Sequence, residues 1–155
     1  MPEKTLTIRE AVKSDDVIIA KHLCQLALEL GVTSDSIRHD WLEKTTRFIK
    51  RARDELCYRG FMAEINGQVI GSASCQILEL YPMVSEAYQK GYIWGLYVEP
   101  NYRRQGVATK LMDQSVIYLK DIGCTKAVLH ASDTGKLLYS GLGYVESNEM
   151  VLNLE

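Results

Sequence analysis

The spacing of apolar residues along the chain predicts a series of strands. Residues 4–9 alternate between apolar and polar side chains, as a half-buried strand does. Residues 61–65 and 68–77 flank Asn66 and Gly67, a pair that supplies the positive φ angles of a type I′ turn, so they predict an antiparallel hairpin. Residues 91–98 are dense in β-branched and aromatic residues and predict another strand, and two further strands are predicted at residues 126–131 and 144–152.

Segments with a helical period of apolar residues separate these strands. Ser14 predicts the start of a first helix, and a basic amphipathic helix is predicted over residues 37–55. The period becomes helical again over residues 105–122, and residues 134–140 predict a short fourth helix. Strands and helices therefore alternate through residues 1–155 without a repeat or a linker, which predicts one α/β or α+β domain.

The composition agrees with one folded domain and narrows the classes of partner. Hydrophobic residues make up 46% of the 155 residues and charged residues 25%, which is typical of globular proteins. Lys and Arg number 18 against 20 Asp and Glu, a net charge of -2. The sequence therefore offers no positive field that would hold a nucleic acid, and none is expected as a partner.

The distribution of apolar residues and cysteines indicates the compartment and the chemistry. No apolar run approaches the roughly 20 residues that cross a bilayer, and residues 1–10 lack the basic and apolar regions of a signal peptide. We therefore expect a cytoplasmic protein without a membrane partner. No C-x-x-C pair occurs, so neither a metal site nor a redox motif is expected at Cys24, Cys57, Cys75 and Cys124.

One segment combines the features of an anion site. Residues 96–111 are predicted to form a strand, a sharp loop and the first turn of a helix, where backbone N–H groups and the positive end of the helix dipole converge. Gly106 has no Cβ and would let a phosphate approach its backbone, while Arg103 and Arg104 add positive charge. A basic loop that merely caps a helix has the same pattern, so these residues alone leave both interpretations open.

The same loop carries the signature of a protein family. Residues 103–108, Arg-Arg-Gln-Gly-Val-Ala, resemble the [RQ]-x-x-G-x-[GA] motif of the GNAT superfamily of acyl-CoA-dependent N-acyltransferases. Val98-Glu99-Pro100 resembles the family's V-x-P element, and residues 138–144, Leu-Tyr-Ser-Gly-Leu-Gly-Tyr, resemble its L-Y-x-x-x-G-[FY] element. These motifs lie within residues 92–145, whereas the first half of the chain resembles the family only in its order of strands and helices.

The resemblance implies a single GNAT-like N-acetyltransferase domain of the α/β (α+β) class over residues 1–155. Such a domain has a mixed, mostly antiparallel central sheet of about six to seven strands, flanked by about four helices. A splayed pair of strands forms the cleft for acetyl-CoA. A bulge near Gly95 would help to open this cleft, although close packing against a neighbour would equally explain a glycine there.

The resemblance also implies where acetyl-CoA binds. Its pantetheine arm would follow the strand at Leu96, Tyr97 and Val98. Its pyrophosphate would lie on the backbone of the loop and helix start, at Arg104, Gln105, Gly106, Val107, Ala108 and Thr109, with Arg103 at the rim. Ser132 stands where many members have an Asn that contacts the cofactor arm; alternatively Ser132 or Asp133 caps the short helix.

Within the L-Y element, Tyr139 is the candidate general acid of this family. A phenol stays protonated at neutral pH and can donate its proton to a departing thiolate. A backbone N–H of the preceding strand would stabilise the oxyanion. For the general base, Glu79, His130 and a water held by Tyr92 are alternatives, and each is equally explained as an ordinary rim or core residue.

Two functions follow from these residues. The first is direct transfer of the acetyl group of acetyl-CoA, through a ternary complex, to a primary amine of a small molecule or of a protein or peptide. The second is a catalytically silent acyl-CoA-binding regulatory module, and the presence of Tyr139 favours the enzyme. Aromatic residues on the acceptor side make an apolar or aromatic amine conceivable; they are Trp41, Tyr58, Tyr81, Tyr88, Tyr92 and Trp94. The acceptor, the acyl length and the oligomeric state, a homodimer included, stay open.

Overall fold

The computed structural model describes residues 5–79 and 89–155 of the chain, and Tyr81 and Tyr88 lie outside these residues. The strands are β1 (Leu6–Glu10), β2 (Arg59–Ile65), β3 (Gln68–Leu78), β4 (Lys90–Val98) and β5 (Lys126–Val128). The α-helices are α1 (Asp16–Glu29), α2 (Trp41–Glu55), α3 (Val107–Asp121) and α4 (Lys136–Gly141). Short 3-10 turns precede α1, α2 and α3. None of the described helices is long and apolar enough to cross a membrane.

The strands form a mixed sheet in sequence order, β1-β2-β3-β4-β5. The first three pairs are antiparallel and the β4–β5 pair is parallel, so the predicted mixed, mostly antiparallel sheet is confirmed. The predicted hairpin is also confirmed, because Asn66 and Gly67 adopt φ angles of 52° and 76° between β2 and β3.

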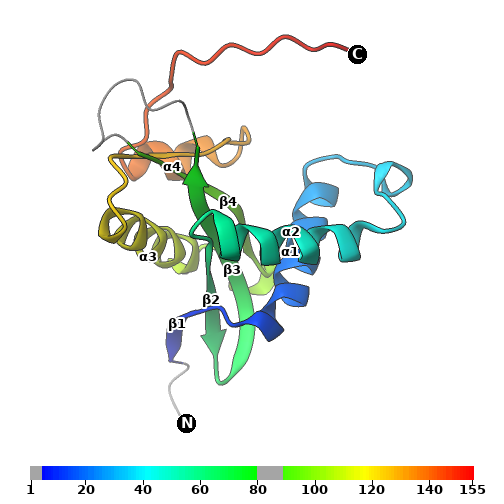
Figure 1. Cartoon of the computed structure of the whole chain (residues 1–155). Helices are drawn as coiled ribbons and strands as arrows, with labels where there is room; N and C mark the ends of the chain where they lie inside the picture. The colour runs from blue at the N-terminus through cyan, green and yellow to red at the C-terminus, as the bar shows by residue number, and fades with distance from the viewer. Residues whose placement is uncertain (1–4, 80–88) are drawn as a thin grey trace.

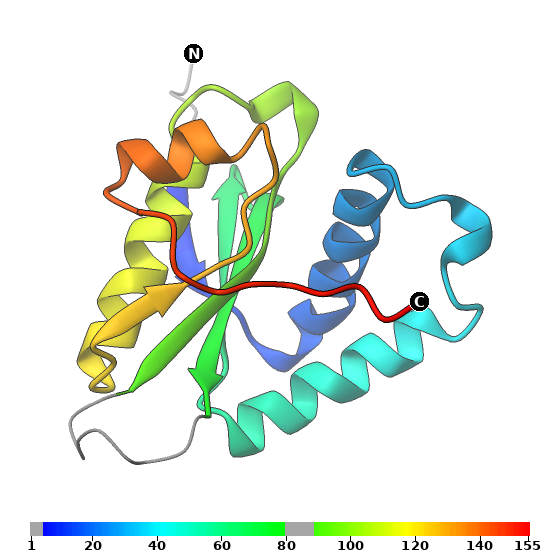
Figure 2. The same cartoon turned by 90° about the horizontal axis from the view of Figure 1, so that it is seen from above.

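Helices cover both faces of the sheet, with α1 and α2 on one side and α3 on the other (Figures 1 and 2). The core under α3 is built from apolar side chains of the sheet and helix, among them Phe61, Ala73, Ile93, Leu111 and Leu119. The core under α1 and α2 is smaller and includes Ile19, Ile49, Ala52, Tyr58 and Met62. Asp16 and Arg53 form an ion pair of 2.6 Å that joins the start of α1 to the end of α2.

The described part of the sheet has five strands, not the expected six to seven. The strand expected over residues 144–152 is absent, and the one expected over residues 126–131 ends at Val128. The apolar side chains of the C-terminal segment find no neighbour; Val145 is 90% exposed and Val151 89%. Figure 1 shows this segment as a red extended trace that runs away from the sheet. Residues 146–149 are Glu-Ser-Asn-Glu, so the segment has no continuous apolar face to bury against the sheet.

The start of the first helix also differs from the expectation. Ser14 is exposed and lies inside a 3-10 turn, so it does not cap α1. Instead the buried carboxylate of Asp15 accepts a hydrogen bond of 2.8 Å from the Val12 N–H and pairs with Arg9. Asp15 takes this role in place of Ser14 because its carboxylate can accept from the Val12 N–H and pair with Arg9 of β1 at the same time.

Gly91 provides a test of packing at the base of the β4–β5 pair. A Cβ built on Gly91 would lie 2.5 Å from Cδ1 of Leu119, whose side chain is only 2% exposed and has little room to move. We expect Gly91→Ala to lower the unfolding free energy by about 1–3 kcal/mol. Gly141→Ala is the matched control, because a Cβ there meets no atom within 4 Å. Urea titrations that give the two variants equal stability would contradict this packing.

Candidate functional site

The site begins where β4 leaves β5. The two strands pair at three positions only, from Lys90 with Lys126 to Tyr92 with Val128, while β4 continues to Val98. The register of β3 against β4 shifts between Ser72 and Ser74. At this shift Gly95 has a φ of 67°, and a Cβ on it would only touch Leu23 at 3.8 Å. The predicted bulge is therefore confirmed, and close packing does not explain the glycine.

The loop between β4 and α3 forms a concave turn of backbone. Gly106 adopts a φ of 82° and stands at the N-cap of α3, whose first helical residue is Val107. No side chain caps this helix end. Within the described residues no acceptor is bound by the N–H groups of Val107, Ala108 and Thr109, so these donors and the helix dipole point to one place. A Cβ on Gly106 would meet nothing within 4 Å, so the space above it is open.

The two arginines of this loop have different surroundings. Arg103 donates through Nε to the carbonyl of Val98 at 2.8 Å, and its Nη2 lies 2.9 Å from both carboxylate oxygens of Glu29. Arg104 is exposed, adopts a φ of 60°, and has no ion pair among the described residues. Arg103 thus fastens the loop to the end of α1, while the charge of Arg104 stays available to an anion.

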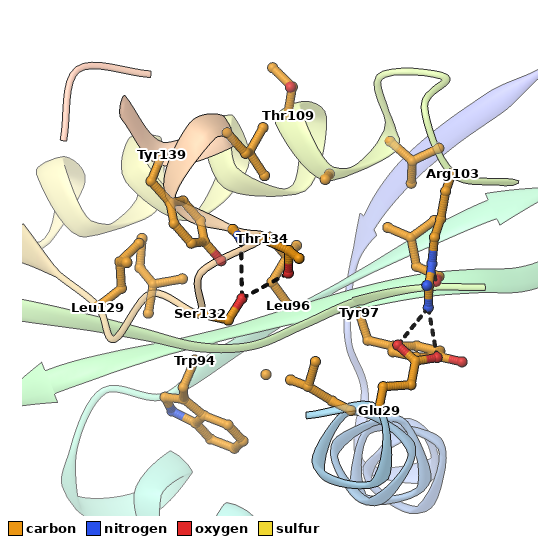
Figure 3. A pocket seen from close by; sticks show the side chains of 18 of the residues that line it. Glu29, Trp94, Leu96, Tyr97, Arg103, Thr109, Leu129, Ser132, Thr134 and Tyr139 are labelled. Carbon is orange, nitrogen blue, oxygen red and sulfur yellow. Dashed lines mark hydrogen bonds and ion pairs between the residues drawn. The ribbon is translucent and has the colours of Figure 1, made fainter. Parts of the chain in front are cut away.

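A cavity of about 760 Å³ lies between the loop, the open part of β4 and α4. Figure 3 shows Arg103 and Glu29 at one end and Tyr139 and Leu129 at the other. All but one of the predicted cofactor residues line it; they are Leu96, Tyr97, Val98, Arg103, Arg104, Gly106, Val107, Ala108, Thr109, Ser132 and Tyr139. Gln105 does not line it, and its amide instead donates to the carbonyl of Asn101 at 3.3 Å.

Tyr139 projects from α4 toward the open strand β4 (Figure 3). Burial raises the pKa of its phenol above the ordinary value of 10, so the hydroxyl keeps its proton at neutral pH. Ser132 has a structural role, because its Oγ accepts a hydrogen bond of 3.1 Å from the Gly135 N–H just before α4. The N-cap of α4 is Gly135 and no described side chain caps this helix, so neither Ser132 nor the exposed Asp133 next to it fills the expected capping role.

The three alternatives for the base are separated by the structure. Glu79 is exposed just after β3 and lines neither this cavity nor the next one. His130 lines the cavity and its Nδ1 lies 3.0 Å from the hydroxyl of Tyr92. Tyr92 lines a second cavity of about 410 Å³, so the Tyr92–His130 pair connects the two cavities.

Sequence reasoning missed a row of polar groups beneath α1 and α2. Ser72, Ser74 and Gln76 alternate along β3 and are buried on the side of these helices. Each has a partner: His22 at 2.7 Å from Ser72, Tyr58 at 2.9 Å from Ser74, and Trp94 at 2.9 Å from Gln76. Polar residues at every second position of an otherwise apolar strand are the signal that points to such a row.

Comparison with known proteins assigns the chain to a protein family. The sequence model described as the acetyltransferase (GNAT) family matches residues 20–144. The chain belongs to this family. The crystal structure of a predicted acetyltransferase with acetyl-CoA from Clostridium acetobutylicum has a TM-score of 0.85 at 26% identity and covers 97% of each chain. The α+β GNAT fold of this chain thus has a mixed sheet of five described strands and four α-helices.

Curated relatives in this family act on different acceptors. N-alpha-acetyltransferase 30 of Xenopus laevis is 28% identical over 109 residues, which cover 68% of this chain and 37% of that protein. Aminoglycoside N(6')-acetyltransferase type 1 of Acinetobacter haemolyticus is 29% identical over 93 residues, which cover 58% of this chain and 64% of that protein. The chain therefore spans little more than a third of the first relative.

His22 provides a pH test of the buried polar row. Its side chain is 7% exposed, and burial lowers the pKa of its imidazole, although Nε2 lies 3.7 Å from Glu99. The unfolded chain therefore binds the proton more readily than the folded one, so stability is full above the unfolded pKa of about 6.5 and falls as the pH drops through the folded pKa. We expect His22→Gln to lose less unfolding free energy than the wild type between pH 7.5 and pH 5 in urea titrations. Parallel pH curves for the two proteins would contradict a buried neutral imidazole.

Proposed function

We propose that the protein is an N-acetyltransferase that transfers the acetyl group of acetyl-CoA directly to a primary amine within a ternary complex. The observation that carries this proposal is that two cavities meet at one residue. Trp94 lines both the cavity beside the phosphate loop and the second cavity under α1 and α2. A thioester in the first cavity and an amine in the second would meet beside this residue without leaving the protein.

The first cavity supports acetyl-CoA as the acyl donor. Its volume of about 760 Å³ falls within the range of ligand sites. The helix start at Gly106 offers backbone donors for a pyrophosphate, and Arg104 adds a positive charge that no carboxylate of the described residues pairs with. β4 beyond Tyr92 lacks β5 as a neighbour, so its backbone groups can pair with an extended amide-containing arm.

The residues around the junction would serve the transfer as follows. A C–N bond forms between the free-base amine and the acetyl carbon, and the thioester C–S bond breaks. The proton lost by the nitrogen leaves through a base, for which the position of His130 between the two cavities is the best suited. The thiolate takes the phenolic proton of Tyr139, which is then restored from water.

Gly106 tests the phosphate loop. We expect Gly106→Asp to weaken acetyl-CoA binding at least about tenfold more than Gly106→Asn, because only the aspartate adds a negative charge beside the phosphates. Gly106→Asn is a matched control, because Asp and Asn side chains have nearly the same size and both residues tolerate the left-handed backbone conformation of this position. Calorimetry of the two folded variants gives the comparison, and equal affinities would remove this loop from the cofactor site.

Tyr139 tests the chemistry. We expect Tyr139→Phe to lower kcat and kcat/KM about 10²-fold, the lower end for a positioned acid, with the affinity for acetyl-CoA nearly intact. Tyr144→Phe is the matched control: its ring lies 5.9 Å from that of Tyr139, and its buried hydroxyl has no hydrogen-bond partner among the described residues.

Steady-state rates with an amine for which chemistry limits turnover would decide between the two functions. Equal kcat in Tyr139→Phe and the wild type would exclude Tyr139 as the acid. Tight acetyl-CoA binding without transfer to any amine would instead identify a silent acyl-CoA-binding module.

A further inference from the structure

The second cavity has a distinctly apolar wall. Its volume is about 410 Å³, and Leu23 of α1, Phe48 of α2, and Tyr92 and Trp94 of β4 line it. The rings of Phe48 and Trp94 lie 5.9 Å apart between centroids, at an angle of 58°. Rings at this distance and tilt offer a surface on which an aromatic or bulky apolar group gains contact without leaving polar atoms unpaired.

Gln76 and Lys44 bring hydrogen-bond donors to this cavity, beside the hydroxyls of Thr45 and Tyr92. Gln76 is 7% exposed, and its Oε1 already accepts the Trp94 Nε1–H at 2.9 Å. None of the described residues accepts the N–H groups of the Gln76 amide, so these donors are free for a ligand oxygen. Lys44 of α2 also lines the cavity; Asp40, one turn earlier on the helix, is held by Arg38 at 2.9 Å.

The charges of this cavity disfavour a polycation. Among the described residues that line it there is no carboxylate, and Lys44 supplies a positive charge. A ligand ammonium that packs against this wall would give up part of its hydration and gain no counterion from the described lining residues, which is unfavourable. An acceptor with a single amine reacts as its uncharged free base and avoids this cost, whereas a second ammonium group on the acceptor would keep its charge.

We propose that the second cavity selects a primary amine carried on an aromatic or bulky apolar group, with a carbonyl or carboxylate oxygen close to the amine and no second positive charge. This inference rests on the proposed acetyl transfer and specifies its acceptor. The apolar group would pack against the rings of Phe48 and Trp94, and the oxygen would accept from Gln76 or Lys44. The amine itself would lie beside Trp94, where the two cavities meet.

A panel of three amines tests the selection. We measure kcat/KM, expressed per free-base amine, for L-phenylalaninamide, 2-phenylethylamine and the aminoglycoside kanamycin. We expect L-phenylalaninamide to exceed 2-phenylethylamine about three- to tenfold through the hydrogen bond to its oxygen, and to exceed kanamycin at least about 100-fold. Tripeptides that begin with phenylalanine, set against L-phenylalaninamide, show whether the source is a free small molecule or a peptide N-terminus.

Variants assign the selection to the named residues. Gln76→Glu keeps an oxygen for the Trp94 N–H but removes the donors, so the ratio of L-phenylalaninamide to 2-phenylethylamine should fall toward one. Lys44→Glu should raise kcat/KM for kanamycin about three- to tenfold. Lys50→Glu is the matched control, because it makes the same change of charge on α2 at an exposed position outside the cavity. Equal effects of the two lysine variants would overturn the role of Lys44.

A binding measurement separates this inference from the proposed transfer. Trp41 and Trp94 are the two tryptophans of the chain, so Trp41→Phe leaves the Trp94 indole N–H as the single reporter in NMR spectra. With CoA bound, L-phenylalaninamide should shift this signal and kanamycin should not. Acetylation of kanamycin with no shift by L-phenylalaninamide overturns the inference while the transferase stands. A shift without acetylation of any amine supports the proposed ligand of the second cavity and overturns the acetyl transfer. If L-phenylalaninamide causes no shift and no amine is acetylated, both proposals are overturned.

Discussion

The hydrogen bonding of β4 determines where a ligand can enter this fold. Its inner edge is paired with β3 along most of its length, but its outer edge meets β5 at three positions only. Beyond Tyr92 the two strands separate, and the bulge at Gly95 turns the backbone further. An open strand edge, a helix start and the residues of α4 then border one cavity. If the parallel pairing with β5 continued to the end of β4, the open edge of β4 would be paired and this side of the cavity would be filled by a strand.

One helix takes part in both cavities, which is why the N-terminal half matters for function. Leu23 of α1 lines the second cavity, and Leu26 and Glu29 line the first. The Asp16–Arg53 pair fixes the start of α1, and the Glu29–Arg103 pair fixes its end. Between them His22 is bonded to Ser72 of β3. The distance between the two cavities is therefore set by a helix anchored at three points.

The sequence predicted most of the local elements and the strand-loop-helix junction before the third α-helix, because both depend on short-range patterns. The Asn66-Gly67 turn and the strand-loop-helix junction at Gly106 are each determined by residues adjacent in sequence. The failures concern partners distant in sequence. The segment expected as a strand over residues 144–152 pairs with no strand of the described sheet. Ser14 does not cap the first helix, because the Asp15 carboxylate binds the Val12 N–H and also pairs with Arg9. The pairing of His22 with Ser72 spans 50 positions and could not be read from either residue alone.

The left-handed backbone of Arg104 links stability to ligand attraction at a single position. A residue with a long side chain, such as arginine, requires roughly 1–2 kcal/mol to hold such a conformation, which glycine adopts freely. Glycine would relieve this strain, yet it would also remove the loop's exposed charge. The empty protein and the protein with a bound anion therefore prefer different residues here. A search for more stable variants would select against the side chain that we propose attracts the anion, so thermostability and affinity would have to be optimised against each other at this position.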